Sequence, residues 1–252
     1  MQKSYLNLVS SLCYAVFSLI VVLGLSIILF QTPAYAISKW QLNYNKAVGF
    51  LKKKKYNSAL KFAKISLKEN KNPYTLQLNG NILQFLKKYQ RSNYYFKKSL
   101  ALIITKVNKK GGSGKKTENF IKIVKNNIGI NYLLAGNMQL KKKNIKDAIS
   151  NYKKGLTFAN KKHLKDDLMI NAAISYENIN KFKPAIYYSK KVVANSPKNA
   201  FGYFVKGRAE YGLNKLNPSI ADLKTAVKLS PSDKLFKSAL RLVEKKKNAK
   251  KS

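Results

Sequence analysis

The chain has 252 residues, 45% of them hydrophobic, which is enough for a sizeable core or a stack of repeats and excludes a disordered polymer. Its formal charge is +40, but 47 of the 50 basic residues are lysine, and arginine occurs only at positions 91, 208 and 241. Base-specific recognition relies on arginine, so the lysine excess reflects either compositional bias with solvated surfaces or attraction to anionic lipid, nucleic acid or an acidic protein.

Residues that could bind a metal or carry out catalysis are scarce. The single cysteine, Cys13, lies in an N-terminal apolar run, and the single histidine, His163, stands among lysines. These are too few ligands for a transition metal, so we expect no metal and no cofactor. The one adjacent acidic pair, Asp166 and Asp167, would point about 100° apart on a helix and would not share a site. We therefore expect no enzymatic activity.

The N-terminus carries an export or membrane signal. Nineteen uncharged apolar residues run from Leu12 to Phe30, a length that can span a bilayer. The sequence Ala34-Tyr35-Ala36 follows, as at a signal-peptide cleavage site. We expect residues 1–36 to be a cleaved signal peptide, leaving Ile37 first, or an uncleaved anchor with membrane contact through residues 12–30. Both place the protein on the extracytoplasmic side, and an inverted anchor that faces the cytoplasm is the alternative.

Prolines reveal a repeat in the C-terminal half of the chain. Pro184 and Pro218 are 34 residues apart, and so are Pro197 and Pro231. Proline is tolerated where a helix begins and is common just after a helix ends, so the first pair marks helix starts and the second pair marks helix ends. Apolar residues at helical spacing lie between them, and the repeating unit is therefore a helix-turn-helix.

The last copy of this unit resembles the tetratricopeptide repeat. Tyr203, Gly207, Tyr211, Ala226 and Pro231 fall close to the family pattern, with the tyrosine one residue past its usual place. The resemblance implies an all-α, right-handed α-solenoid of about five helix-turn-helix repeats, which become stable only by stacking. A small residue on the first helix then lets the second helix approach closely.

The same pattern divides the rest of the chain. We expect two repeats in residues 37–104, a flexible glycine- and lysine-rich loop in residues 105–117, three repeats in residues 118–231, and a capping helix with a basic tail in residues 232–252. The first helix of the third repeat is expected to be unusually long. Gly114-Lys115 resembles the end of a phosphate-binding loop, but lysine replaces both the first glycine and the hydroxyl residue of that motif, so we expect no nucleotide site.

The resemblance also implies where a partner binds, because repeats of this family bind proteins along the concave surface of their first helices. The corresponding positions here are Tyr44, Asn45, Asn81, Asn137, Asn171, Arg208 and Tyr211. Asparagine offers a donor and an acceptor to an extended peptide, and arginine and tyrosine offer charge and stacking. Gln77 and Leu133 stand where carboxylate-binding members would have lysine, which argues against that type of groove. Packing between repeats is the alternative role of the two tyrosines.

These features together predict a protein–protein interaction scaffold, exported or membrane-attached, that binds a client protein in its concave groove and acts as an assembly factor. The alternative is a basic helical module that binds RNA or an anionic membrane through its lysine surface. Salt distinguishes the two, because binding to phosphate or to lipid headgroups weakens steeply as salt rises.

Overall fold

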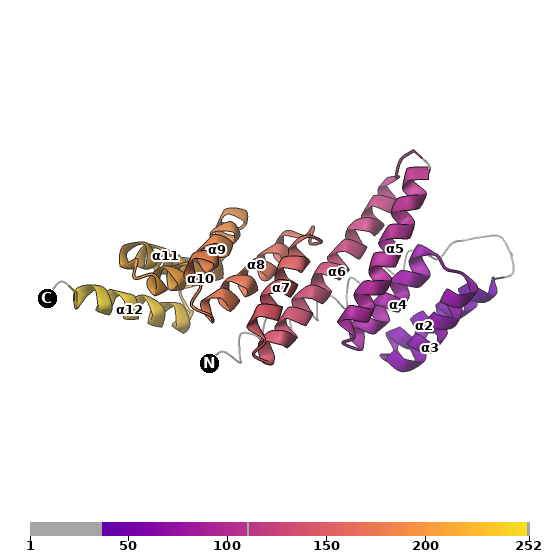
Figure 1. Ribbon diagram of the computed structural model, residues 1–252, viewed down its shortest axis with the longest axis horizontal. Coiled ribbons are helices and arrows are strands. Elements are labelled where there is room, and N and C mark those ends of the chain that lie inside the picture. Colours follow the sequence, from indigo (N-terminus) through magenta and orange to yellow (C-terminus); the bar gives the residue numbers. More distant parts are fainter. Residues whose placement is uncertain (1–36, 110, 251–252) are drawn as a thin grey trace. The chain divides into compact units, whose positions relative to one another are not determined.

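The computed structural model describes residues 37–109 and 111–250 (Figure 1). These residues form eleven α-helices and no β-strand, which confirms the predicted all-α class. The signal or anchor segment predicted for residues 1–36 lies outside the described residues.

The helices belong to two compact units, which meet in sequence between Lys71 and Asn72. The first unit contains α2 (Lys39–Lys52) and α3 (Tyr56–Glu69). The second unit contains four helix pairs and a final single helix: α4 (Pro73–Phe85) with α5 (Tyr89–Lys109), α6 (Lys115–Lys141) with α7 (Ile145–Leu156), α8 (Lys162–Glu177) with α9 (Phe182–Asn195), α10 (Ala200–Gly212) with α11 (Leu216–Leu229), and α12 (Lys234–Asn248). The predicted helix-turn-helix repeats are thus present, and the first two of them fall in different units.

The two helices of a pair meet at a small residue on the first helix. A Cβ atom added at Gly136 would lie 2.4 Å from a ring carbon of Tyr152, and one added at Gly207 would lie 2.8 Å from Leu223 Cγ. Both distances are shorter than real Cβ contacts, so glycine is required for the observed approach. The close contact predicted at Gly207 is confirmed.

A serine on the second helix strengthens two of these contacts. Ser92 Oγ donates to the carbonyl oxygen of Gly80, and Ser219 Oγ donates to that of Gly207, each at 2.7 Å. Both serines are fully buried. The hydroxyl is therefore satisfied inside the pair and fixes the register of one helix against the other.

All five helix pairs turn in the same way. One residue in each turn has a left-handed backbone, with φ between 55° and 63°: Lys54, Lys87, Lys143, Asn180 and Asn214. The N–H of the following residue donates to the carbonyl five residues earlier, as Lys181 does to Tyr176 at 2.9 Å. This is the hydrogen bond of a Schellman motif, which ends a helix and reverses the chain.

Helices α5 and α6 have 21 and 27 residues, whereas the other described helices have 12 to 16. The prediction that the first helix of the third repeat is long is confirmed. The flexible loop that we expected over residues 105–117 is shorter than predicted, because α5 continues to Lys109 and α6 begins at Lys115. Ile103 of α5 is buried in one cluster with Val124 of α6, and this burial stabilises the added turns.

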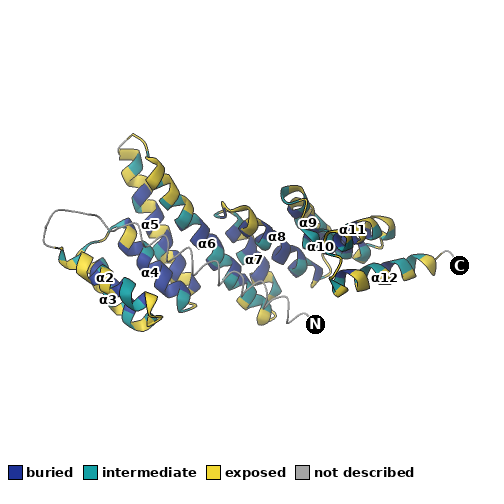
Figure 2. Cartoon of the chain, turned by 180° about the vertical axis from the view of Figure 1, so that it is seen from behind, coloured by how far each residue is buried: buried dark blue, intermediate teal, exposed yellow. Residues whose placement is uncertain are grey.

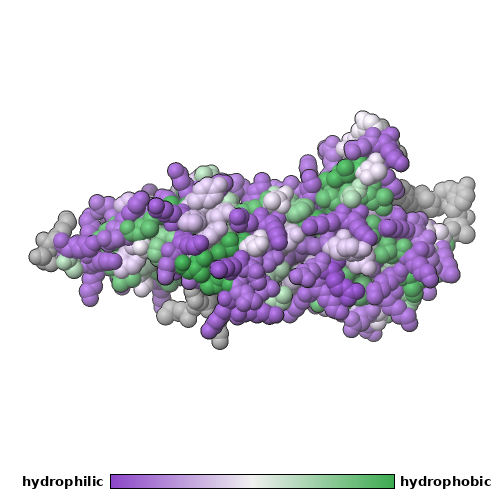
Figure 3. Space-filling view, in the orientation of Figure 1, coloured by the Kyte–Doolittle hydropathy of each residue, from purple (hydrophilic) through white to green (hydrophobic). Residues whose placement is uncertain are grey.

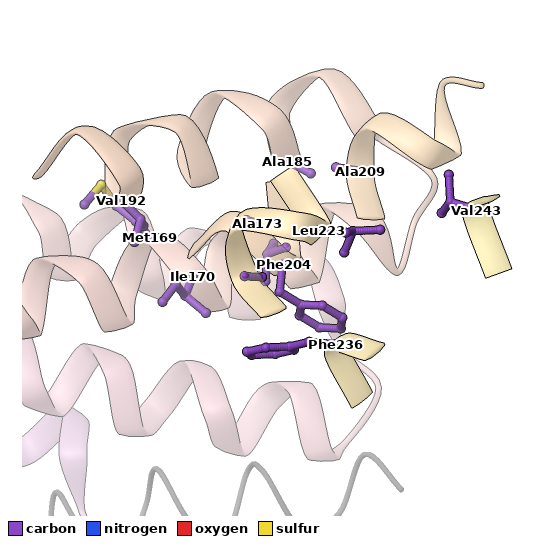
Figure 4. Close-up of a cluster of buried hydrophobic side chains, with 12 residues drawn as sticks. Met169, Ile170, Ala173, Ala185, Val192, Phe204, Ala209, Leu223, Phe236 and Val243 are labelled. Carbon is purple, nitrogen blue, oxygen red and sulfur yellow. The ribbon is translucent and has the colours of Figure 1, made fainter. Parts of the chain in front are cut away.

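A hydrophobic core joins helices α8 to α12 of the second unit (Figure 4). Its centre is a stacked pair of rings, Phe204 of α10 and Phe236 of α12, with centroids 4.8 Å apart. Val243 brings a second buried side chain from α12. Helix α12 therefore covers the apolar side of the last pair, as expected of a capping helix.

Buried residues lie where neighbouring helices of each unit meet, and exposed residues lie on the outer sides (Figure 2). Throughout the described part of the chain, no helix combines the length and apolar character that crossing a bilayer requires.

The contact at Gly207 can be tested by adding a side chain. We expect Gly207→Leu to lower the free energy of unfolding by about 1 to 3 kcal/mol, because the new atoms must displace Leu223 and a backbone carbonyl. Gly49→Leu is the matched control, since nothing lies within 4 Å of a Cβ added there. Denaturant unfolding should separate the two variants, and equal stability would mean that the helix contact is not tight.

Candidate partner-binding surface

The first helices of the second unit contact one another in a row: α4 with α6, α6 with α8, α8 with α10, and α10 with α12. Each second helix instead contacts the two first helices on either side of it in sequence. The solvent side of α4, α6, α8 and α10 is called here the first-helix face. Most of the groove residues predicted from the sequence belong to these four helices.

At α4 and α6, asparagines connect neighbouring helices. Asn127 Nδ2 donates to Asn81 Oδ1 at 3.3 Å, and Asn131 Nδ2 donates to Ser92 Oγ and Asn93 Oδ1, both at 2.8 Å. All of these residues are buried. Asn81, which we expected to contact a partner, is therefore held between two helices. Asn127 and Asn131 were not identified from sequence, although their spacing of four residues places them on one side of a helix.

At α8 and α10, an acidic and a basic side chain meet. Arg208 Nη2 lies 3.4 Å from Glu177 Oε2, and the guanidinium group lies over the ring of Phe204 at 5.4 Å from its centroid. The Glu177 side chain is 5% exposed, whereas that of Arg208 is 40% exposed. The carboxylate oxygens of Glu177 accept no hydrogen bond within the described residues, so the contact is an ion pair only. Burial raises the pKa of Glu177 to about 7, and Arg208 opposes this shift.

A second charged cluster lies between α10 and α11. Lys206 Nζ lies 2.6 Å from Asp222 Oδ2 and 3.5 Å from Glu210 Oε1. Burial raises the pKa of Glu210 to about 7, and the nearby Asp222 adds to the shift, while Lys206 opposes it. The cluster is largely enclosed, because Glu210 is 6% and Asp222 is 8% exposed.

The other candidates occupy different surroundings. Asn137 is half-buried and accepts a hydrogen bond from the Tyr152 hydroxyl at 2.8 Å, and buried Asn171 donates to the carbonyl of Asp167 on its own helix at 2.7 Å. Tyr211 is half-buried under Lys246 of α12, whose Nζ lies 4.5 Å from the ring centroid.

The two remaining candidates belong to α2 of the first unit. Tyr44 is half-buried beside Trp40, with ring centroids 6.4 Å apart, and Asn45 is exposed.

The sequence did not identify Glu177 as a groove residue. Its position four residues after Ala173 matches that of Tyr211 after Gly207, and acidic residues are rare in this chain, so both signals were present. Within the described residues, no three histidine, cysteine, aspartate or glutamate side chains are placed to hold a metal ion.

No protein-family model matches this chain, and no curated protein is significantly similar to it in sequence. Among solved structures, the MamA protein matches with a TM-score of 0.50 and 14% identity over 76% of this chain and 92% of that chain. The Hsp90 co-chaperone Cns1 from Saccharomyces cerevisiae matches with a TM-score of 0.48 and 26% identity over 50% of this chain and 41% of that chain. The first TPR domain of Spaghetti (RPAP3), bound to an HSP90 peptide, matches with a TM-score of 0.44 and 25% identity over 46% of this chain and 90% of that chain. The MamA likeness shows the fold alone.

The buried carboxyl groups predict how stability depends on pH. A carboxyl whose pKa is higher in the folded state stabilises the fold at low pH, and this contribution is lost as pH rises from about 4.5 through about 7. Between about pH 4.5 and about pH 8, the free energy of unfolding should fall less for Glu177→Gln than for wild type, by on the order of 3 kcal/mol.

Urea unfolding across this pH range measures the difference. Glu118→Gln, at an exposed position of α6, controls for the loss of one carboxylate. A Glu177→Gln profile that overlays the wild-type profile would contradict the assignment.

Proposed function

We propose that this chain, which has the fold of tetratricopeptide-repeat proteins, is a protein-interaction scaffold. Its first-helix face binds an extended, acidic segment of a partner protein. The observation that carries the proposal is the setting of Arg208, a half-exposed cation on this face with a buried carboxylate beside it and an aromatic ring beneath it.

Contacts within the protein hold the Arg208 side chain in place before a ligand binds. A guanidinium group has five N–H donors, and the ion pair with Glu177 involves only one of its nitrogens. The ring of Phe204 supports the planar group from one side. Because these contacts restrict the side chain in advance, less conformational entropy is lost when its remaining donors bind a carboxylate or a carbonyl oxygen.

Other polar groups along the row of first helices also favour an acidic partner. Asn137 uses its oxygen to accept from Tyr152, which leaves its amide N–H groups as donors. Lys246 adds an ammonium group next to Tyr211. The acidic side chains nearby, Glu177 and Glu210, are buried. The face therefore offers mainly donors and positive charge, and the net charge of +40 accelerates association with an anionic partner.

We further propose that the scaffold works outside the cytoplasm, exported or attached to a membrane, where it assists the assembly of its partner. This part rests on the sequence of residues 1–36 alone: an uncharged run at residues 12–30 and the Ala34-Tyr35-Ala36 pattern after it.

The role of Arg208 can be tested with partner capture. Photo-crosslinking from position 137 in the native cell should trap one partner protein, whose binding segment is then synthesised and titrated. Arg208→Ala should weaken binding of that segment at least about tenfold, since hydrogen bonds to a charged group contribute about 1.5 to 3 kcal/mol. Arg208→Lys should recover only part of the affinity, because it keeps the charge and loses the planar fork.

Arg91→Ala is the matched control, since Arg91 is exposed on α5, a second helix, and lies outside the first-helix face. It should bind the segment as wild type does. Equal loss in both alanine variants, or full affinity in Arg208→Ala with unchanged helix content, would contradict the proposal.

The export signal has a direct test. Mass spectrometry of the protein isolated from its native cell should show Ile37 as the first residue if cleavage occurs, or the intact chain in the membrane fraction if it does not. An intact chain whose lysines react only with reagents delivered from the cytoplasm would reject export.

A further inference from the structure

The second helices of the repeats share one pattern of burial. In α5 the buried residues Ser92, Phe96 and Ser99 follow one another at spacings of four and three residues. The same spacing recurs in the other second helices of the second unit: Ala148, Tyr152 and Gly155 in α7, Ala185, Ser189 and Val192 in α9, and Ser219, Leu223 and Ala226 in α11. These positions face the neighbouring first helices, so they define the inner side of each second helix.

Lysine recurs at a fixed position relative to this pattern. The fifth residue after the first buried position is an exposed lysine in α5, α7, α9 and α11, and the sixth is also lysine in the first three. These residues are Lys97, Lys98, Lys153, Lys154, Lys190, Lys191 and Lys224, and they are called here the lysine ladder. In the first unit, Lys64 of α3 occupies the same position after Ala59.

The ladder lies on the outer side of each helix. At about 100° per residue, the buried positions of a second helix lie within about 60° of one another, and the fifth and sixth positions lie at about 140° and 240° from the first. Six of the seven lysines therefore point away from the first helices and from the first-helix face. Lys97 is the exception, because its ammonium group lies 3.2 Å from the Tyr132 hydroxyl of α6.

Little negative charge offsets the ladder. Helices α5 and α9 contain no acidic residue, and Asp222 of α11 is buried and paired with Lys206. Helix α7 carries one exposed acid, Asp147, against its two ladder lysines. Lys224 lies 3.7 Å from Glu244, but both side chains are well exposed, and exposed pairs contribute little. Hydrophilic residues cover most of the surface seen in Figure 3.

Two exposed tyrosines accompany the ladder at equivalent positions. Tyr94 of α5 and Tyr187 of α9 are each 54% exposed, two residues after the first buried position. The ammonium group of Lys98 lies over the ring of Tyr94 and that of Lys191 lies over the ring of Tyr187, each at 4.3 Å from the centroid. Tyrosine with lysine is a combination typical of the membrane–water interface.

We propose that the lysine ladder is a docking surface for an anionic lipid bilayer. Lysine is a compact point charge that suits a headgroup layer, in which no bidentate geometry has to be matched. Single-stranded nucleic acid fits less well, because the rings that could stack on bases, Tyr94 and Tyr187, are each covered by a lysine. The inference rests on the second helices alone. A bilayer bound there leaves the first-helix face free for a protein partner.

The test measures how strongly the full-length chain prefers anionic vesicles. Partition coefficients are measured by flotation with phosphatidylcholine vesicles and with equimolar phosphatidylcholine and phosphatidylglycerol vesicles, and their ratio removes the contribution of residues 12–30. For wild type, the partition coefficient on anionic vesicles should be about 100 times that on neutral vesicles. This is the increase in affinity expected from about two or three lysines near an anionic surface. Replacing the seven ladder lysines by glutamine should lower the ratio below about ten, and high salt should do the same to wild type.

The control variant replaces seven other exposed lysines by glutamine: Lys109, Lys115, Lys116, Lys122, Lys141, Lys142 and Lys143. It has the same net charge as the ladder variant and should keep the wild-type ratio. A ladder variant with the wild-type ratio, or a control that loses as much, would overturn the proposal. So would loss of binding to a single-stranded RNA oligonucleotide by the ladder variant with no change in the lipid ratio. If wild type does not bind neutral vesicles, that result counts against the membrane anchor. The ratio of the two partition coefficients is then a lower bound.

Discussion

The close approach of two helices at a residue with little or no side chain is the constraint on which this fold depends. Gly80, Gly136 and Gly207 have no room for a Cβ atom, and fully buried alanines, Ala47 and Ala173, take the equivalent position in the other pairs. One helix pair cannot bury its own apolar side, so the pairs of the second unit stack and share their cores. This stacking makes the row of first helices and turns the opposite side of each second helix to solvent.

In a chain with 50 basic and ten acidic residues, four of the acidic side chains have an internal role. Asp166, Glu177, Glu210 and Asp222 are all buried. Glu177 and the pair Glu210 and Asp222 each lie beside a basic side chain of α10. A buried carboxylate is unfavourable by itself, and its contact with a cation limits that penalty while it orients the cation. These few buried acidic side chains thus position two basic side chains, Lys206 and Arg208.

The repeat architecture separates two surfaces of different chemistry. The first-helix face mixes half-buried asparagine, tyrosine and arginine with apolar positions, a composition that suits the recognition of a peptide. The outer side of the second helices carries lysine at a repeated position, which suits contact with a layer of anionic groups that has no defined geometry. Since every helix pair of the second unit contributes one helix to each surface, the two surfaces can be occupied together.

The sequence by itself determined the repeat and its turns. Prolines 34 residues apart, small residues such as Gly207 and the apolar spacing are local signals, and they suffice because each helix pair is built from neighbouring residues. Which first-helix side chains meet was decided only by the tertiary structure. Asn81 pairs with Asn127, 46 residues away, and Arg208 pairs with Glu177, 31 residues away. Those pairings follow from how successive repeats stack, and the lengths of α5 and α6 likewise follow from burial between repeats, which no local pattern encodes.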